Sequence, residues 1–466
     1  MALTLTLLTL PEDILLSILL FLRPENILIL SQTCRVLHEF TTNDYLWHTI
    51  TTHYPAALDI EPYVDRNDLS GPTLQAIVTR ALRVDHNWRR INPRIKQLTR
   101  LVDLDGVSQM QFIASHWLVV LRRSSLSVWR VAETSEPYLA AAIDLPGPAV
   151  PLKFAAAMQR GCKEVLIAVI SPSKSGTLLS AYTVFLKSQR DDANILPSLR
   201  CSIYKPQSEG RFYEVHALGT LIAAGIPQFI DGVLSPGAYR ILFINYMTSV
   251  QCLVDPQLPE EFTQIHFQIS RTQLVLAGVC SQSSLIVRTH DLPASVVATS
   301  SPVSESAESL TTPNTEYESP KISDLDYTLS ADSTHDLPHI SSISFHSLVR
   351  MADGYIVHFP LHSKAKTPSF AHPLNTHPAS SSEIVCLGET GSRAVWLERR
   401  WGSDEYMLMK AAFSPDGETP VVVEPLLARH MALPFQLRMC QALAFEEATA
   451  RVALAVHSGE LFILQF

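Results

Sequence analysis

LPEDILLSILLFLRPENILILSQTCRVLHEFTTNDYLWHTI, residues 10–50, carries three short helical patterns in a chain of 466 residues. Pro11 suits the first position of a helix, where its missing N–H costs nothing, and Glu12 and Asp13 suit the positive end of the helix dipole. Apolar residues then recur at the spacing of one helical face: Ile14, Leu15, Ile18, Leu19 and Leu22. Further leucines flank that face, so the segment has more apolar surface than one small core can bury. This surplus predicts docking to a partner protein.

The stop signals divide the segment into short helices. Pro24 ends the first pattern, and residues 26–32 form a second apolar turn or two. The unit closes with Leu46 and Trp47, and Asp44 is placed to cap the last short turn.

This combination resembles an F-box. The resemblance rests on the opening Leu10-Pro11-Glu12-Asp13-Ile14-Leu15, the Leu22-Arg23-Pro24 break and the closing Leu46-Trp47. Leu37 departs from the family, which often has tryptophan there, but a large apolar residue is retained. The resemblance implies docking onto a Skp-type linker subunit of a cullin ubiquitin ligase. It also implies that the linker-facing residues are Leu10, Pro11, Ile14, Leu15, Ile18 and Leu19.

Two other interpretations of the N-terminal segment compete. The first is a signal peptide or membrane helix, because Leu3–Leu22 is rich in leucine. No basic residue precedes the apolar run, no small-residue cleavage site follows it, and Pro-Glu-Asp interrupts it, whereas a spanning helix needs about 20 mainly apolar residues. The second is a helical cap packed on its own domain. We favour the docking unit over both.

Composition indicates an intracellular protein with many short buried strands. The chain is 47% hydrophobic and only 17% charged, and its net charge of -9 argues against nucleic acid as the main partner. No two cysteines form a C-x-x-C pattern, which predicts reduced thiols in the cytoplasm or nucleus. The seven cysteines are Cys34, Cys162, Cys201, Cys252, Cys280, Cys386 and Cys440. We expect no membrane partner.

A helical connector follows the first domain. Residues 74–83 are amphipathic, and the run from Arg80 to Arg90 contains Trp88. This stretch resembles the junction between F-box and propeller in F-box proteins of the WD-repeat kind, with Trp88 packing the helix against the first strands. An isolated surface helix, the alternative, would not need a buried tryptophan. We therefore expect an F-box at 1–55 and a connector at 56–96.

Strand patterns recur at intervals of roughly 40 to 50 residues from residue 97 onward, a period typical of propeller blades. About seven units, each with three recognisable strands, begin near Val107, Leu152, Tyr213, Gln264, Ile340, Ile384 and Ala442. The chain is thus predicted to be multidomain, with a small all-α F-box of three short helices and an all-β propeller of about seven blades at 97–466.

The last unit ends on a third strand, so its sheet lacks an outer strand. Ile95–Leu104 is a suitable strand just upstream of the first unit, and pairing there would close the ring without leaving an open edge. The repeats are only WD-like: no Gly-His pair opens a unit, and the dipeptide appears as Val128-Trp129-Arg130. A β-sandwich with a large insert is the structural alternative.

Residues 293–338 interrupt the rhythm of the strands. This range is rich in Ser, Thr, Pro, Asp and Glu, and we expect a disordered insert because it has too few apolar residues to offset the ordering entropy. Ser301, Thr312 and Ser319 each precede proline and are candidate phosphorylation sites, each adding a charge of about -1.5 to -2. A passive linker is the simpler interpretation.

A target-binding face is expected at the loops between second and third strands. Those loops contain residues 227–238 and six candidate target-binding residues: Arg122, Arg123, Lys174, Arg399, Arg400 and Trp401. Cations beside an exposed aromatic are enriched at interface hot spots, and arginine can grip phosphate through two hydrogen bonds. Ordinary solvated hairpin tips are the competing interpretation.

Catalytic signatures are not recognisable in the sequence. There is no H-E-x-x-H, no G-x-S-x-G, no phosphate-binding glycine loop and no metal-ligand spacing, so we expect no metal, no cofactor and no catalytic residue. The leading hypothesis is a substrate-recognition adaptor of an SCF-type ubiquitin ligase that binds linker, cullin and an unknown target, with a phosphorylated protein as one candidate for that target. A propeller scaffold outside ubiquitin transfer and a propeller enzyme are the alternatives.

Overall fold

The structure is a computed structural model of the 466-residue chain. It describes residues 10–466 apart from 55, 62–63, 132–135, 146–150, 160–163, 175, 187–199, 205–210, 231–232, 259–261, 270–272, 281–284, 294–307, 310–312, 314, 319–324, 332–340, 348–354, 360–369, 374–379, 401, 414–420, 429–430 and 432.

Four short helices form the N-terminal unit: α1 (Glu12–Leu20), α2 (Pro24–Leu30), α3 (Arg35–Thr41) and α4 (Asp44–Thr52). Three were expected; the third pattern divides because the side chain of Asn43 accepts a hydrogen bond from Tyr45 N at 2.9 Å and starts a new helix. The expected cap, Asp44, instead accepts a hydrogen bond from the backbone N–H of Gly71.

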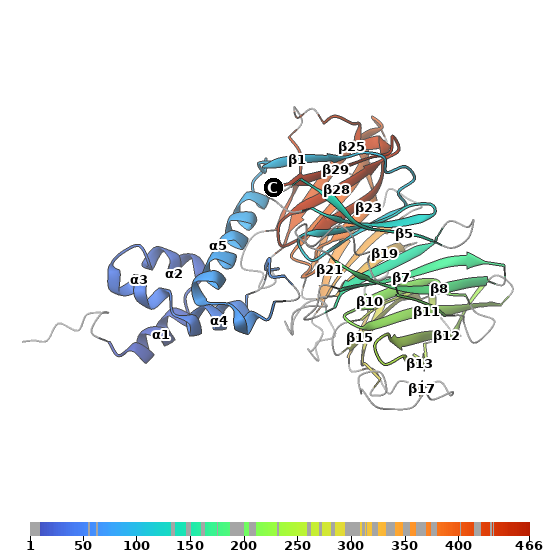
Figure 1. The fold of residues 1–466 in the computed structure, drawn as a ribbon, viewed down its shortest axis with the longest axis horizontal. Helices are drawn as coiled ribbons and strands as arrows, with labels where there is room; N and C mark the ends of the chain where they lie inside the picture. The colour runs from blue at the N-terminus through green and yellow to red at the C-terminus, as the bar shows by residue number, and fades with distance from the viewer. Residues whose placement is uncertain are drawn as a thin grey trace, which may run out of the picture.

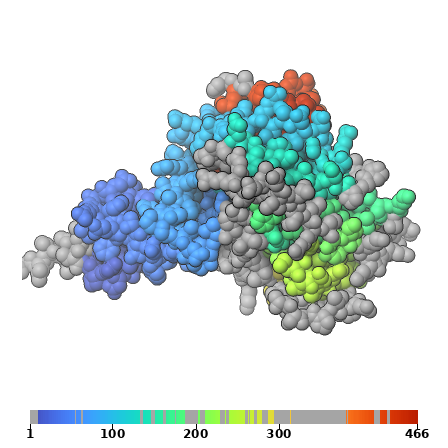
Figure 2. All heavy atoms as spheres, viewed as in Figure 1, coloured from blue at the N-terminus to red at the C-terminus, as the bar shows by residue number. Residues whose placement is uncertain are grey.

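Helix α5 (Gly71–Trp88) joins this unit to the rest of the protein, after the short 3₁₀ helix η2 (Arg66–Asp68). Leu74, Val78 and Ala81 of α5 pack into the helical core around Trp47. Its last turn, with Val84 and Trp88, packs into the β-sheet core instead. Figure 1 shows α5 running from the helical unit into the strands, and Figure 2 shows the helical unit projecting from the larger body.

The described strands form seven sheets, and about seven units were expected from the sequence. We call them blades 1 to 7, in chain order of their first strands. Blades 1 and 2 contain β2 (Gln109–Ile113), β3 (Trp117–Leu121), β4 (Ser125–Arg130) and β5 (Tyr138–Asp144), then β6 (Lys153–Met158), β7 (Glu164–Ser173), β8 (Gly176–Phe185) and β9 (Arg200–Tyr204). Blade 3 contains β10 (Glu214–Leu218), β11 (Leu221–Ile230), β12 (Val233–Asn245), β13 (Val250–Asp255) and β17 (Glu308–Ser309).

The remaining blades follow the same antiparallel order. Blades 4 and 5 contain β14 (Phe262–Ile269), β15 (Gln273–Cys280), β16 (Leu285–Asp291) and β18 (Thr315–Glu318), then β19 (Leu325–Ala331), β20 (Ser341–Ser347), β21 (Tyr355–Phe359) and β22 (Phe370–Pro373). Blades 6 and 7 contain β23 (Ser380–Leu387), β24 (Arg393–Arg400), β25 (Glu405–Ala412) and β26 (Val422–Pro425), then β27 (Cys440–Glu446), β28 (Arg451–Val456), β29 (Glu460–Gln465) and β1 (Gln97–Leu101). A 3₁₀ helix, η3 (Leu437–Met439), precedes blade 7.

The blades make a closed ring, which confirms the propeller. The first strands of neighbouring blades lie against one another, except that β20 of blade 5 contacts β23 of blade 6, and β2 of blade 1 also contacts β27 of blade 7. Apolar clusters fill the spaces between neighbouring blades, for example Val119 with Ile167 and Leu242 with Ile170. Burial between twisted sheets explains why so many strands are apolar on both faces, as the all-buried β3 and β28 illustrate.

The ring closes through β1, as predicted from Ile95–Leu104. β1 pairs antiparallel with β29, from Gln97 opposite Gln465 to Leu101 opposite Leu461. β1 is therefore the outer strand of blade 7, and the expected missing strand comes from the segment just before blade 1.

Two sequence-based boundaries differ from the structure. Strands β17, β18 and β19 lie inside 293–338, where one disordered insert was expected; the overall Ser/Thr/Pro-rich composition hid the alternating apolar positions Leu325, Tyr327 and Leu329. As a result β20 is the second strand of blade 5, not the first. Apart from residues 293 and 313, the rest of that range lies outside the described residues. The expected loop at 227–238 is instead largely strand, because β11 and β12 pair from Gln228 opposite Ser235 to Ile230 opposite Val233.

Candidate partner-docking sites

An apolar row lies on the outer side of α1. Ile14 and Ile18, one helical turn apart, are 44% and 38% exposed, and Phe21 at the end of the helix is 92% exposed. Exposed apolar side chains also occur on the other helices, at Ile29, Val36 and Tyr45. A helical unit with this much exposed apolar surface matches the surplus expected from the sequence, and such surfaces mark protein interaction sites.

The six predicted linker-facing residues divide into two groups. Pro11, Ile14 and Ile18 are exposed and Leu10 is half-buried. Leu15 and Leu19 are buried, and Leu19 belongs to the core around Trp47 and Val78. Leu19 points inward because α4 and α5 contribute residues to the same core, which the spacing of apolar residues cannot reveal. The accessible docking surface is therefore Ile14, Ile18 and Phe21, and contact of any of these residues with a linker stays a prediction.

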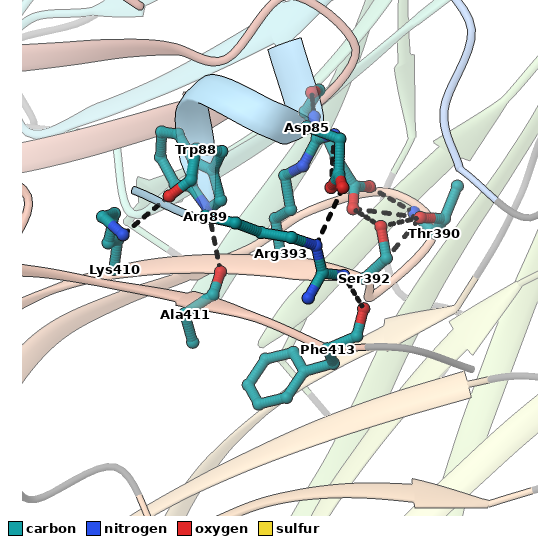
Figure 3. Close-up of polar contacts among 10 residues, drawn as sticks. Asp85, Trp88, Arg89, Thr390, Ser392, Arg393, Lys410, Ala411 and Phe413 are labelled. Atoms are coloured by element: carbon teal, nitrogen blue, oxygen red, sulfur yellow. Dashed lines mark hydrogen bonds and ion pairs between the residues drawn. The ribbon is translucent and has the colours of Figure 1, made fainter. Parts of the chain in front are cut away.

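Trp88 fixes the connector to the propeller. Its ring stacks on Phe445 at a centroid distance of 5.3 Å and meets Phe466 edge-on at 5.7 Å. Its indole N–H donates to the carbonyl oxygen of Ala411 at 2.9 Å. The burial of Trp88 was predicted, but its partners belong to blades 6 and 7 rather than to the first strands. Figure 3 shows Trp88 beside Ala411.

Two buried cations complete this junction. The guanidinium of Arg393 donates to Asp85 Oδ1 of α5 at 3.1 Å and to the carbonyl oxygen of Glu447 at 2.7 Å. The ammonium of Lys410 donates to the carbonyl oxygen of Trp88 at 2.6 Å, at the negative end of α5. Burial lowers the pKa of Lys410 to about 8. These residues anchor the end of α5 on blade 6 (Figure 3).

A second anchor lies on blade 1. The segment before α5 contributes Asp59, which pairs with Arg80 at 3.0 Å, and Glu61, which lies 3.6 Å from Arg130. His116 lies within 4 Å of both carboxylates, and burial is the main cause that lowers its pKa. Neither anchor was predicted, because residues such as 85 and 393 are distant in sequence and no local pattern links them.

The two anchors define the face of the propeller to which the helical unit is attached, here called the connector face. β24 begins there at Arg393 and ends at Arg400, about 23 Å away at the usual rise of a strand. Because strand direction alternates in the same order in every blade, all turns between second and third strands lie on the opposite face, here called the turn face. The helical unit and these turns thus occupy opposite faces.

The predicted target-binding residues lie on the turn face but do not form one cluster. Arg122 and Arg123 follow β3 in blade 1, and Arg122 donates to the carbonyl oxygen of Asp103 at 3.2 Å. Lys174 is exposed at the tip of the β7–β8 hairpin in blade 2. Arg399 and Arg400 end β24 in blade 6. Trp401, Ser301, Thr312 and Ser319 lie outside the described residues.

Arg399 and Arg400 already have carboxylate partners. The guanidinium of Arg399 bonds Asp404 at 2.8 Å and lies 3.8 Å from Glu383, and Arg400 lies 3.7 Å from Glu405. The hydrogen bond to Asp404 is the main cause that raises the pKa of Arg399. A phosphate would therefore have to displace a carboxylate, so this pair of arginines is a poorer phosphate site than the sequence indicated.

Two other kinds of site are absent from the described parts of the chain. No three His, Cys, Asp or Glu side chains come together there in a way that could hold a metal ion. Among the same residues, none of the helices combines the length and apolarity needed to cross a membrane.

A helical unit with exposed apolar residues, anchored to one face of a propeller, is an architecture typical of adaptors. Residues 7–53 match a family model described as F-box-like. The chain therefore carries an F-box-like domain followed by a β-propeller. A chain of a solved structure entitled "Crystal Structure of Mitotic Checkpoint Complex" is 10% identical, with a TM-score of 0.44 over 80% of this chain and 94% of that one. No curated protein sequence matches the chain.

Proposed function

We propose that the protein is the substrate-recognition adaptor of an SCF-type ubiquitin ligase, acting inside the cell. The F-box-like domain docks to a Skp-type linker, which in turn binds the cullin, and the propeller holds a target protein. The observation that carries the proposal is the exposed row Ile14, Ile18 and Phe21 on an F-box-like domain. Apolar side chains at this density require a protein surface to cover them.

The contribution of this chain is proximity rather than chemistry. Holding a target lysine near a charged ubiquitin-conjugating enzyme raises the effective concentration of the amine without a catalytic side chain here. The opposed connector and turn faces suit this role, because linker and target then bind without competing for one surface. The Asp85–Arg393 and Glu61–Arg130 pairs hold the helical unit on the connector face.

Co-purification with linker and cullin tests the proposal. The double substitution Ile14→Glu and Ile18→Glu places two charges in the docking surface without touching the buried Leu15 and Leu19. We expect recovery of the linker to fall at least about tenfold, because each buried charge would lack a partner. The matched control is Ile91→Glu, an isoleucine that is 70% exposed and lies outside the helical unit, which should bind as the parent chain does.

The results distinguish the proposed ligase adaptor from a propeller scaffold. Undiminished linker recovery by the double variant would contradict the docking assignment. If the parent chain recovers linker but never cullin, the protein is a propeller scaffold whose F-box joins a complex outside ubiquitin transfer.

A further inference from the structure

A groove of about 570 Å³ runs along the outer edge of blade 6, in the size range of ligand sites. One wall is the first half of β25, from Glu405 to Leu408. The other wall comes from the segment that leads from β26 to blade 7, and its described lining residues are Leu427, Ala428, Met431, Leu433 and Phe435 to Arg438. Phe435 in this wall is stacked on Phe462 of β29 at 4.3 Å, so the wall is anchored to blade 7.

The β25 wall is a sheet edge with backbone groups aimed into the groove. β26 pairs only with Met409–Ala412, and no described strand pairs with Glu405–Leu408 on that side. The carbonyl oxygen of Leu408 accepts from Leu426 N at 2.7 Å, so the backbone of Leu408 points toward the outer side. Alternate residues of a strand point the same way, so the N–H and C=O of Tyr406 also face the groove.

The mouth of the groove offers two partly exposed carboxylates. The side chains of Asp404 and Glu405 are 63% and 50% exposed, whereas the side chains of their partners, Arg399 and Arg400, are 32% and 23% exposed. Arg438, which is exposed, also lines the groove, so a segment that binds there meets both carboxylates and a cation. The mouth lies on the turn face, at the far end of β25 from the Trp88 junction.

We propose that this groove binds an extended segment of a target protein by strand addition to β25. The segment pairs its backbone with Tyr406, packs apolar side chains against Met431 and Leu433, and brings a basic side chain to Asp404 and Glu405. Strand addition gives affinity through main-chain hydrogen bonds and specificity through alternate side chains. That the segment belongs to a target protein rests on the proposed function, whereas the groove and its chemistry do not.

Fluorescence anisotropy with the full-length chain tests the groove directly. The probe is a labelled eight-residue peptide in which valine and leucine alternate with serine, with arginine at one end. We expect saturable binding, weakened at least about tenfold when the alternate amides are N-methylated, because methylation blocks strand pairing. Replacing the arginine of the peptide by glutamate should weaken binding about fivefold.

A pair of matched variants localises the binding. Met431→Glu changes a wall residue that is 40% exposed, and Met439→Glu changes a methionine that is 39% exposed and does not line the groove. Both add a negative charge, which by itself would favour the basic peptide. We expect at least a tenfold loss with Met431→Glu alone, owing to the lost apolar contact. Thermal unfolding at the parent temperature confirms that both variants fold.

Four outcomes would overturn the inference: no saturable binding, equal binding of the N-methylated peptide, equal binding of the glutamate peptide, or equal losses in the two methionine variants. If Met431→Glu misfolds, the N-methylated peptide and the glutamate peptide still test whether the groove binds by strand addition. Failure of linker recovery with intact peptide binding would reject only the proposed ligase function. Loss of peptide binding with intact linker recovery would reject only the groove.

Discussion

The β24–β25 hairpin has charged residues at both of its ends, but the two ends use them differently. At the connector face, Arg393 and Lys410 are fully buried and donate hydrogen bonds to α5 and to the backbone of blade 7. At the turn face, Arg399 and Arg400 form partly exposed pairs beside an open groove. One end of the hairpin therefore holds the helical unit, whereas the other end is open to a partner.

The largest expected effect is at Trp88. Trp88→Ala removes a fully buried ring and should lower the free energy of unfolding by about 3–5 kcal/mol. Urea unfolding followed by far-UV circular dichroism measures it. Trp88→Phe keeps the stacking on Phe445 but loses the bond to Ala411, and should cost about 1–2 kcal/mol. If Trp88→Ala lowered the free energy of unfolding as little as a turn-face variant does, the expected difference between the two ends would be contradicted.

Arg393→Met should come next, with a loss of about 2–3 kcal/mol in the free energy of unfolding. The substitution leaves the carbonyl oxygen of Glu447 and the carboxylate of Asp85 without their cationic donor. The same denaturation experiment checks this, and Arg393→Lys, which keeps the charge, should lie between parent and variant. Equal stability of Arg393→Met and the parent chain would show that the buried bonds do not contribute net stability.

Lys410 should give the junction a pH dependence. Its folded pKa of about 8 lies below the usual 10.5, so between these values the folded state releases a proton that the unfolded state keeps. The contribution of Lys410 to the free energy of unfolding therefore rises with pH across that window, and below pH 8 the cost of burying the charge is at its greatest. Relative to Lys410→Met, the parent chain should gain about 1–2 kcal/mol between pH 7.5 and 9.5. Parallel pH profiles for the two proteins would contradict this.

The smallest effect is expected at the turn face. Arg399→Ala breaks exposed pairs with Asp404 and Glu383, which contribute little because water and salt screen them. The midpoint of thermal unfolding should not change measurably. A loss comparable with that of Arg393→Met would mean that both ends of the hairpin are structural, and would remove the contrast.

The blade strands were predictable wherever apolar runs alternate with turns. The unit expected to begin near Val107 contains β3, whose five residues are all buried. Outer strands such as β5 were missed, because a half-exposed strand carries a weaker apolar pattern. β19 was hidden by the polar composition around it.

The candidate sites were predictable only in part. Spacing located the apolar side chains of α1, but it could not show that Leu15 and Leu19 are buried in this chain, because that depends on tertiary packing. The residues at 399–400 were correctly placed beside a turn, whereas their carboxylate partners and the adjoining groove depend on three-dimensional packing. The Asp85–Arg393 bond joins two positions that no local rule relates.

The pairing of β1 with β29 has a consequence for the order of assembly. During synthesis β1 emerges before every other strand, yet its partner at residues 460–465 emerges after all of them. Blade 7 therefore cannot be completed until the rest of the ring has left the ribosome, whereas the helices that precede β1 are free to fold at the outset. We expect a nascent chain to expose the docking surface of α1 well before its turn face is complete. A linker would then be able to bind the protein before any target can.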